Sequence, residues 1–176
     1  MTSKPDDESK SAFGVRRLET RDWPAVWALM EPIIRAGETY PYARDMDEQG
    51  ARHMWLEVTD AAYVAEDGSG QILGTYYLKP NQPTLGAHVA NAGYMVSAAA
   101  RGRGVATAMC EHSQQEAVLR GYRAMQYNLV VSTNAPGFHL WQKMGFEVVG
   151  ALRDAFLHPS RGYVDAYIMY KLLVTD

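Results

Sequence analysis

The chain has 176 residues, enough for one compact domain, and its 47% hydrophobic content is typical of a globular protein with a sizeable core. Its formal net charge of -3 argues against a general nucleic-acid-binding surface, and no apolar run is long enough for a transmembrane helix. The single cysteine, Cys110, excludes an intrachain disulfide. These features predict a soluble, cytoplasmic protein without nucleic-acid or membrane partners.

Residues 1–12 are polar and charged and do not resemble a signal peptide, so we expect a disordered tail followed by a single domain over residues 13–176. Periodicity and turn residues then predict eleven elements. In chain order these are strand 14–19, helix 22–35, helix 45–58, strands 61–66, 71–79 and 88–96, helix 105–120, strand 125–131, helix 134–144, and strands 146–156 and 163–172. This order predicts an α/β (α+β) mixed sheet with helices on both faces.

Some local signals set the expected helix ends. Asp22 is expected to cap the first helix, in which Pro32 would cause a kink or an early end. Asp45 or Asp47 is expected to cap the second helix. The turn at 67–70, Asp-Gly-Ser-Gly, predicts a hairpin between the strands on either side.

The most informative segment is Arg-Gly-Arg-Gly-Val-Ala at 101–106, between a predicted strand and a predicted helix. Such a turn directs backbone N–H groups at a ligand, and the helix dipole adds about half a positive charge there. Arginines at 101 and 103 add donors that suit phosphate. The turn lacks the ending of a Walker A loop and the spacing of a dinucleotide fingerprint. It predicts a site for a phosphate-bearing cofactor, with a solvated surface turn as the alternative.

Arg101, Gly104 and Ala106 match the pattern Arg/Gln-x-x-Gly-x-Gly/Ala, and the segment Asn-Ala-Pro-Gly-Phe-His-Leu-Trp-Gln-Lys-Met-Gly-Phe follows at 134–146. In this order the two motifs resemble those of the GNAT superfamily of N-acetyltransferases, over residues 14–173. The resemblance implies a GNAT-like fold with a central, mostly antiparallel sheet of about seven strands, and acetyl-CoA as the cofactor. The residues that it implies for cofactor binding are Met95, Val96, Arg101, Gly102, Arg103, Gly104, Val105, Ala106, Thr107, Asn134 and Trp141.

Trp141 departs from the family pattern, because many members carry a tyrosine there that protonates the CoA thiolate. An indole has an N–H donor but no useful acidity. The proton is therefore expected to come from another group or from solvent.

Asparagine is depleted in strands, so Asn91 and Asn128 inside strand patterns need partners, either through edge hydrogen bonds or by lining a cleft. The segments Ala-Asn-Ala-Gly-Tyr and Tyr-Asn-Leu-Val-Val-Ser-Thr-Asn resemble the yeast branch of the family that acetylates azetidine-2-carboxylate, a proline analogue. This resemblance implies that Asn134 orients substrate or stabilises the tetrahedral intermediate. It also implies that Asn91 and Asn128 hold the polar end of the substrate.

No Ser-His-Asp order and no metal-ligand cluster appears, so we expect no metal. Glu38 is a candidate base in a loop that often covers the acceptor in this family, or else a solvated carboxylate. Tyr40 is a candidate pocket wall or else a packing residue of the loop, and Asp165 either recognises the amine or pairs with an arginine. The candidate catalytic residues are Asn134, Asn128 and Glu38, and the candidate substrate-binding residues are Asn91, Tyr40 and Asp165.

His112 and Glu116, four residues apart in a predicted helix, are interpreted as a partly buried pair that satisfy one another, with a catalytic relay as the alternative. The expected function is acetyl transfer from acetyl-CoA to the amine of a small molecule, an amino acid or analogue, by direct attack in a ternary complex. The alternatives are a protein or peptide N-acetyltransferase and a non-catalytic acyl-CoA-binding sensor. The apolar last strands also suggest a homodimer.

Overall fold

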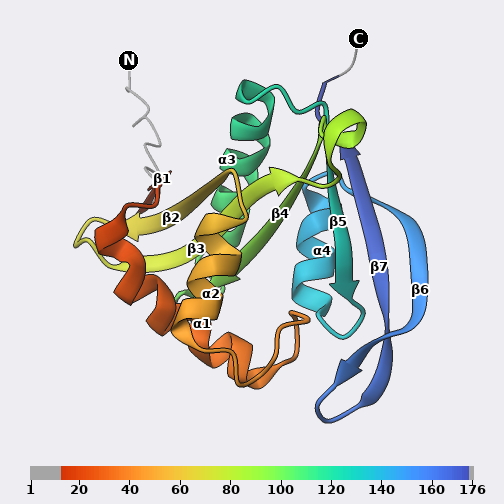
Figure 1. Ribbon diagram of the computed structural model, residues 1–176, viewed down its shortest axis with the longest axis horizontal. Helices are drawn as coiled ribbons and strands as arrows, with labels where there is room; N and C mark the ends of the chain where they lie inside the picture. Colours follow the sequence, from red (N-terminus) through yellow and green to blue (C-terminus); the bar gives the residue numbers. More distant parts are fainter. Residues whose placement is uncertain (1–12, 175–176) are drawn as a thin grey trace, which may run out of the picture.

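The computed structural model describes residues 13–174, a sheet with helices on both of its faces (Figure 1). The expected tail, 1–12, and residues 175–176 lie outside the described residues. The main elements are β1 Phe13–Arg17, α1 Trp23–Ala36, α2 Glu48–Arg52, β2 Ala61–Asp67, β3 Ile72–Pro80, β4 Val89–Val96, α3 Val105–Leu119, β5 Ala124–Val131, α4 Ala135–Lys143, β6 Glu147–His158 and β7 Gly162–Leu172. Their order confirms the succession of strands and helices predicted from the sequence.

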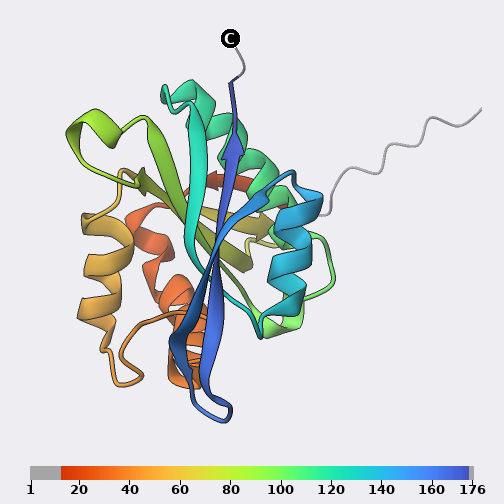
Figure 2. The same ribbon diagram turned by 90° about the vertical axis from the view of Figure 1, so that its right-hand side faces the viewer.

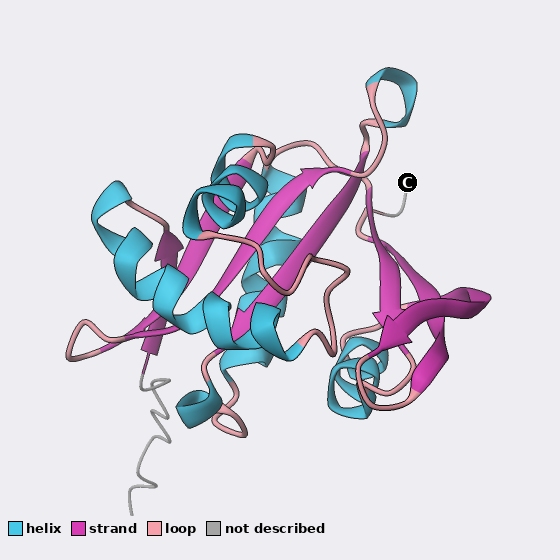
Figure 3. Cartoon of the chain, turned by 60° about the horizontal axis from the view of Figure 1, so that its bottom comes forward, coloured by secondary structure: helices cyan, strands magenta, loops and turns pink. Residues whose placement is uncertain are grey.

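The sheet has seven strands in the order β1-β2-β3-β4-β5-β7-β6. Every neighbouring pair is antiparallel except β4 and β5, which are parallel. The mostly antiparallel mixed sheet is thereby confirmed. Figure 3 shows β1–β4 forming one part of the sheet and β5–β7 forming a second part that turns away from it.

Each face of the sheet carries its own hydrophobic core, because successive side chains of a strand point to opposite faces. Along β3, Tyr76 and Leu78 pack in the core shared with α3 and α4. Tyr77, between them, packs in the core shared with α1 and α2. Figure 2 shows the two helical layers on opposite sides of the strands. Because both faces of β3 are covered, residues 73–78 are all buried and none of them is charged.

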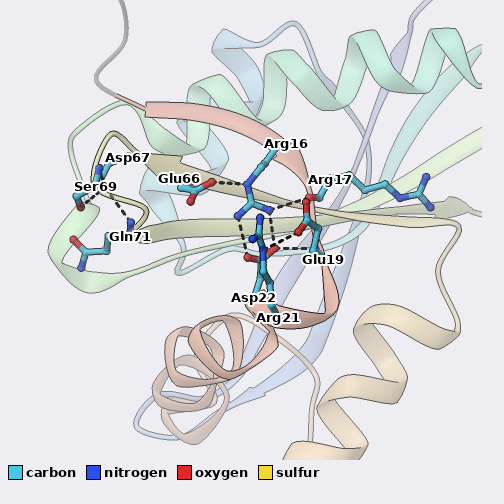
Figure 4. A network of polar contacts seen from close by, with 9 residues as sticks. All are labelled: Arg16, Arg17, Glu19, Arg21, Asp22, Glu66, Asp67, Ser69 and Gln71. Atoms are coloured by element: carbon cyan, nitrogen blue, oxygen red, sulfur yellow. Dashed lines mark hydrogen bonds and ion pairs between the residues drawn. The ribbon is translucent and has the colours of Figure 1, made fainter.

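Asp22 occupies the position before α1, as expected, but its carboxylate does not cap that helix. Both of its oxygens accept hydrogen bonds from the Arg16 guanidinium, at 2.7 and 2.9 Å, and one also accepts from the Glu19 N–H (Figure 4). Arg16 also bonds Glu66 on β2. The Arg16 hydrogen bonds hold the pKa of the buried Asp22 carboxyl below its usual value. Asp22 therefore joins β1 to the chain entering α1, because a nearby arginine competes for its oxygens.

The expected second helix is interrupted. Asp47 caps α2 by accepting from the Gly50 N–H at 2.7 Å, but regular α-helix ends at Arg52 and the chain continues as a π-helical turn over His53–Glu57. Pro32 lies inside α1 without ending it. No helix within residues 13–174 is long and apolar enough to cross a membrane.

The expected pairing of His112 with Glu116 is wrong. The Tyr76 hydroxyl binds His112 Nδ1 at 2.6 Å, and the Tyr63 hydroxyl donates to Glu116 at 2.6 Å. The two tyrosine rings stack at 4.7 Å, and Arg120 also binds Glu116. The strands beneath α3 supply each residue with a separate partner.

Candidate active site

A cleft of about 1080 Å³ opens where β4 and β5 separate. The two strands pair only through Val89 with Ala124 and Ala90 with Met125. Further walls come from the loop at 37–42, the turn after β4, the first residues of α3 and α4, and the β6–β7 hairpin. Segments that are distant in the sequence therefore meet at one opening in the middle of the sheet.

The Asn91 side chain bridges the two strands immediately beyond their last paired residues. Its Nδ2 donates to the Gln126 carbonyl oxygen on β5 at 2.9 Å, and its Oδ1 accepts from the Tyr77 hydroxyl at 3.1 Å. Only 6% of Asn91 is exposed. Asn91 thus satisfies buried polar groups on two neighbouring strands, and its predicted part in substrate binding stays a prediction.

Alternate residues of β4 turn their backbone polar groups into the cleft. The Ser97 N–H binds the Leu73 carbonyl at 2.9 Å, so the odd-numbered residues of β4 face β3. The even-numbered residues face the gap, where the Tyr94 carbonyl accepts from the Tyr40 hydroxyl at 2.8 Å. The Val96 N–H consequently points into the cleft, where it can bind an extended ligand that carries amides.

The turn between β4 and α3 exposes a group of backbone donors. Gly102 and Gly104 have φ of 75° and 81°, the left-handed region that favours glycine. Within residues 13–174 no acceptor binds the N–H groups of these glycines or of residues 105–107. The first turn of a helix has no internal partners, and a glycine N-cap brings no side chain. Since Arg101 and Arg103 are exposed beside these donors, the turn suits a phosphate group.

Trp141 on α4 packs over two tyrosines at the wall of the cleft. Its ring centroid lies 4.9 Å from that of Tyr94 and 5.0 Å from that of Tyr127. The Tyr94 hydroxyl lies 2.7 Å from Ser113 Oγ on α3 and 3.0 Å from the Tyr127 hydroxyl. Burial raises the pKa of both phenols well above its ordinary value. A raised pKa makes each phenol a weaker proton donor than an ordinary tyrosine, so neither is well suited to supply the proton that Trp141 cannot.

Aromatic side chains build the wall on the α1 and α2 face. Tyr40 and Tyr42 stack with their ring centroids 5.3 Å apart, and Trp55 meets the Tyr77 ring edge-on at 4.9 Å. A Cβ on Gly93 would lie 2.6 Å from a ring carbon of Tyr77 and 3.1 Å from the Tyr40 hydroxyl oxygen. Glycine is required at this position because the rings approach the β4 backbone directly.

Glu38 and Tyr40 both line the cleft, but their environments differ. Glu38 is exposed in the loop after α1. Desolvation raises the pKa of Tyr40 well above its ordinary value and that of its neighbour Tyr42 to about 12. Tyr40 is therefore a neutral hydrogen-bond donor that fixes the loop to β4.

Asn128 and Asn134 also line the cleft. Asn128 is exposed on β5, where its Nδ2 donates to Asn81 Oδ1 at 2.7 Å and its Oδ1 accepts from Gln126 at 2.9 Å. Asn134 is the N-cap of α4, and its Oδ1 accepts from the Gly137 N–H at 3.3 Å. The Nδ2 group of Asn134 has no partner among the described residues, so it is available to a ligand.

Two of the predicted site residues do not line the cleft, namely Arg103 and Asp165. Asp165 accepts a hydrogen bond from the Asp154 N–H at 3.0 Å. Asp154 has φ of 50° and lies where the register of β6 and β7 shifts, so Asp165 supports an irregular segment of β6. The expectation of an arginine partner for Asp165 is not met in the described residues. The other predicted site residues all lie on the cleft wall.

Sequence reasoning missed several lining residues, among them Lys79 on β3 and His158 and Arg161 at the β6–β7 hairpin. A signal existed for Lys79, because strand alternation places it on the same face as Tyr77. Nothing in the spacing of the hairpin residues indicated that they would reach a cleft formed by earlier segments.

Comparison with known proteins identifies the family. Residues 15–146 match the acetyltransferase (GNAT) family. The chain belongs to the GNAT acetyltransferase family. As a GNAT N-acetyltransferase it uses acetyl-CoA, as its phosphate-binding turn predicts.

Three similar proteins illustrate the relationship. The N-acetyltransferase aca1 of Schizosaccharomyces pombe is 30% identical over 151 residues, which are 77% of this chain and 72% of that protein. The L-amino acid N-acetyltransferase AaaT of Escherichia coli is 28% identical over 169 residues, 92% of this chain and 99% of that protein. A GCN5-related N-acetyltransferase from Kribbella flavida has a structure with a TM-score of 0.87 and 43% identity, covering 92% of this chain and 98% of that one. The narrower likeness to the azetidine-2-carboxylate branch stays a prediction.

Proposed function

We propose that this chain transfers the acetyl group of acetyl-CoA to the amine of a free amino acid or a close analogue. The observation that carries the proposal is the cleft between β4 and β5, which has a phosphate-binding turn at one end and a polar amide surface at the other. A cofactor and a small polar acceptor can therefore approach one another through the gap in the sheet. The similarity to an Escherichia coli protein named as an L-amino acid N-acetyltransferase supports this acceptor class.

The cofactor would bind along the edge of β4 and around the turn that follows it. The free N–H groups of Gly102, Gly104 and residues 105–107 would bind the pyrophosphate, with Arg101 and Arg103 as cationic partners. The backbone of Val96 would bind a pantetheine amide, and Met95, whose backbone polar groups face β3, would contribute only to the wall beside it. Trp141 would then pack beside the thioester end.

The acceptor amine would attack the thioester carbon directly and form the C–N bond, which gives a tetrahedral oxyanion. As this intermediate collapses, the C–S bond breaks and the thiolate leaves. Cys110 is buried in the core, and burial raises the pKa of its thiol, so it is poorly suited to carry the acetyl group. Glu38 would accept the amine proton, directly or through a water, and the Asn134 Nδ2 would stabilise the oxyanion. Asn128 and Tyr40 would line the acceptor pocket. Asn91 would hold β4 and β5 at a fixed separation through its hydrogen bond to the Gln126 carbonyl.

The homodimer expected from the last strands also stays a proposal. It is supported by large apolar side chains exposed on β6 and β7, including Val149 at 59%, Leu157 at 64% and Tyr163 at 69%. Sedimentation of the purified chain across a range of concentrations tests it, and a monomer at every concentration would contradict it.

The function is tested by measuring CoA release from acetyl-CoA with a panel of amino acids, proline analogues, polyamines and short peptides. We expect turnover with free amino acids or analogues and little with peptides. Turnover with peptides alone would support the peptide-modifying alternative. Acetyl-CoA binding without turnover on any member would support the sensor.

A further inference from the structure

The face of the sheet towards α2 carries a polar patch that the proposed mechanism does not yet use in full. Lys79 on β3 lies opposite Asn91 on β4 in the strand register. Because side chains two residues apart share a face, Lys79 is on the same side as Tyr77. Asn128 reaches this side from β5, where it binds Asn81. Three strands thus bring an ammonium group and several carboxamides to one wall of the cleft.

Lys79 is the unsatisfied member of this patch. Its ammonium nitrogen lies 5.5 Å from the centroid of the Tyr77 ring, which is a cation–π contact. No ion pair and no hydrogen bond of its ammonium group is found within residues 13–174. The carboxamides around it are already paired with one another or with the backbone. The ammonium group of the half-buried Lys79 therefore has N–H donors but no protein acceptor among the described residues.

The charges that line the cleft are unequal. Glu38 is the one carboxylate among the lining residues that the structure describes, whereas Lys79, Arg101 and Arg161 are cations. Arg101 belongs to the turn that suits the cofactor phosphates. A cation left without a partner beside an acceptor pocket favours an acceptor that brings its own negative charge.

We infer that Lys79 binds the carboxylate of the acceptor, so that the enzyme selects free α-amino acids over amines without a carboxylate. This inference rests on the proposed function and adds the residue that sets its specificity. The ammonium would donate to one carboxylate oxygen, and the neighbouring Asn128 carboxamide would border the same group. The amine of the acceptor would then lie on the side towards Glu38 and the thioester. A peptide N-terminus lacks an adjacent carboxylate and would leave Lys79 unpaired.

The test compares each amino acid with its own amide, for the unchanged chain and for Lys79→Met, which keeps the length of the side chain. A hydrogen bond to a charged group contributes enough for about a 10- to 100-fold preference for the acid in kcat/KM. We expect Lys79→Met to lose this preference through a higher KM for the acid, with kcat/KM for the amide unchanged. Lys79→Arg should retain part of the preference.

Arg161→Met is the matched control, because Arg161 is another cation that lines the cleft without an ion pair in residues 13–174. It should keep the preference for the acid. Acetyl-CoA affinity and the thermal melting curve, measured on all three variants, should match those of the unchanged chain. A Lys79→Met variant that keeps the preference, or an Arg161→Met variant that alone loses it, would overturn the inference and leave the proposed function standing. Turnover with peptides but with neither acids nor amides would refute the proposed function itself.

Discussion

Substitution of Asn91 distinguishes most clearly between a structural role of this residue and a role in substrate binding. Its carboxamide accepts from the Tyr77 hydroxyl and donates to the Gln126 carbonyl, and the residue is 6% exposed. The substitution Asn91→Ala removes both hydrogen bonds and leaves a buried hydroxyl and a backbone carbonyl without partners. Asn91→Ala should therefore lower stability whether or not substrate is present.

The magnitude follows from the two orphaned groups. Leaving a buried donor or acceptor unsatisfied costs about 1–3 kcal/mol, so two partly relaxed groups should cost about 2–4 kcal/mol. For a chain of this size, each kcal/mol lowers the melting temperature by about 2–4 °C. We expect a decrease of about 4–16 °C for Asn91→Ala.

Thermal unfolding followed by circular dichroism, without ligands, measures this decrease. Asn128→Ala is the control, because Asn128 lines the same cleft but is exposed, and its loss should change the melting temperature by less than about 2 °C. An Asn91→Ala variant that melts with the unchanged chain, yet has a raised KM for the acceptor, would refute the bridging role and support substrate binding.

The remaining predictions concern the cofactor turn, the reaction and acid stability. Gly104→Asp should weaken acetyl-CoA binding more than about 10-fold in calorimetry, because a carboxylate would repel the pyrophosphate, whereas Gly121→Asp, at an equally open left-handed position beyond the other end of α3, should not. Asn134→Ala should lower kcat about 10- to 1000-fold, and so should Asn134→Ser, which keeps the cap oxygen but lacks the amide; recovery of kcat in Asn134→Ser would show that only capping matters. The lowered pKa of Asp22 gives stability that is present above the unfolded-state pKa of about 3.9 and is lost as pH falls through the lower folded pKa. Below about pH 4 the melting temperature should therefore fall more steeply for the unchanged chain than for Asp22→Asn, and parallel curves would contradict this.

The arrangement of the elements was largely predictable because its causes are local. The turn from Arg101 to Gly104 is predictable from the sequence, because paired glycines between a strand and a helix suit the left-handed backbone that exposes N–H groups. The position of Asn134 is predictable for a similar reason, because this residue belongs to a motif at the start of a helix.

The errors share a different cause, because they depend on neighbours that the local sequence does not reveal. Spacing placed His112 and Glu116 on one helix face but could not show that β2 and β3 would offer each of them a tyrosine. Asp165 alternated correctly along its strand, yet the left-handed residue Asp154 on the adjoining strand uses its carboxylate. Strand alternation indicates the face on which Lys79 lies, but the role inferred for it depends on the charge balance of the whole cleft, which local sequence does not reveal.

The short pairing of β4 with β5 has a consequence for how the chain responds to its surroundings. β4 and β5 share few backbone hydrogen bonds. A ligand between them can therefore bind backbone groups that would pair with a neighbouring strand in a continuous sheet. Anything that binds the folded chain alone raises its stability by mass action, by about 2.7 kcal/mol when the ligand is present at a hundred times its dissociation constant. The free energy of unfolding of this chain should therefore rise with the concentration of acetyl-CoA around it.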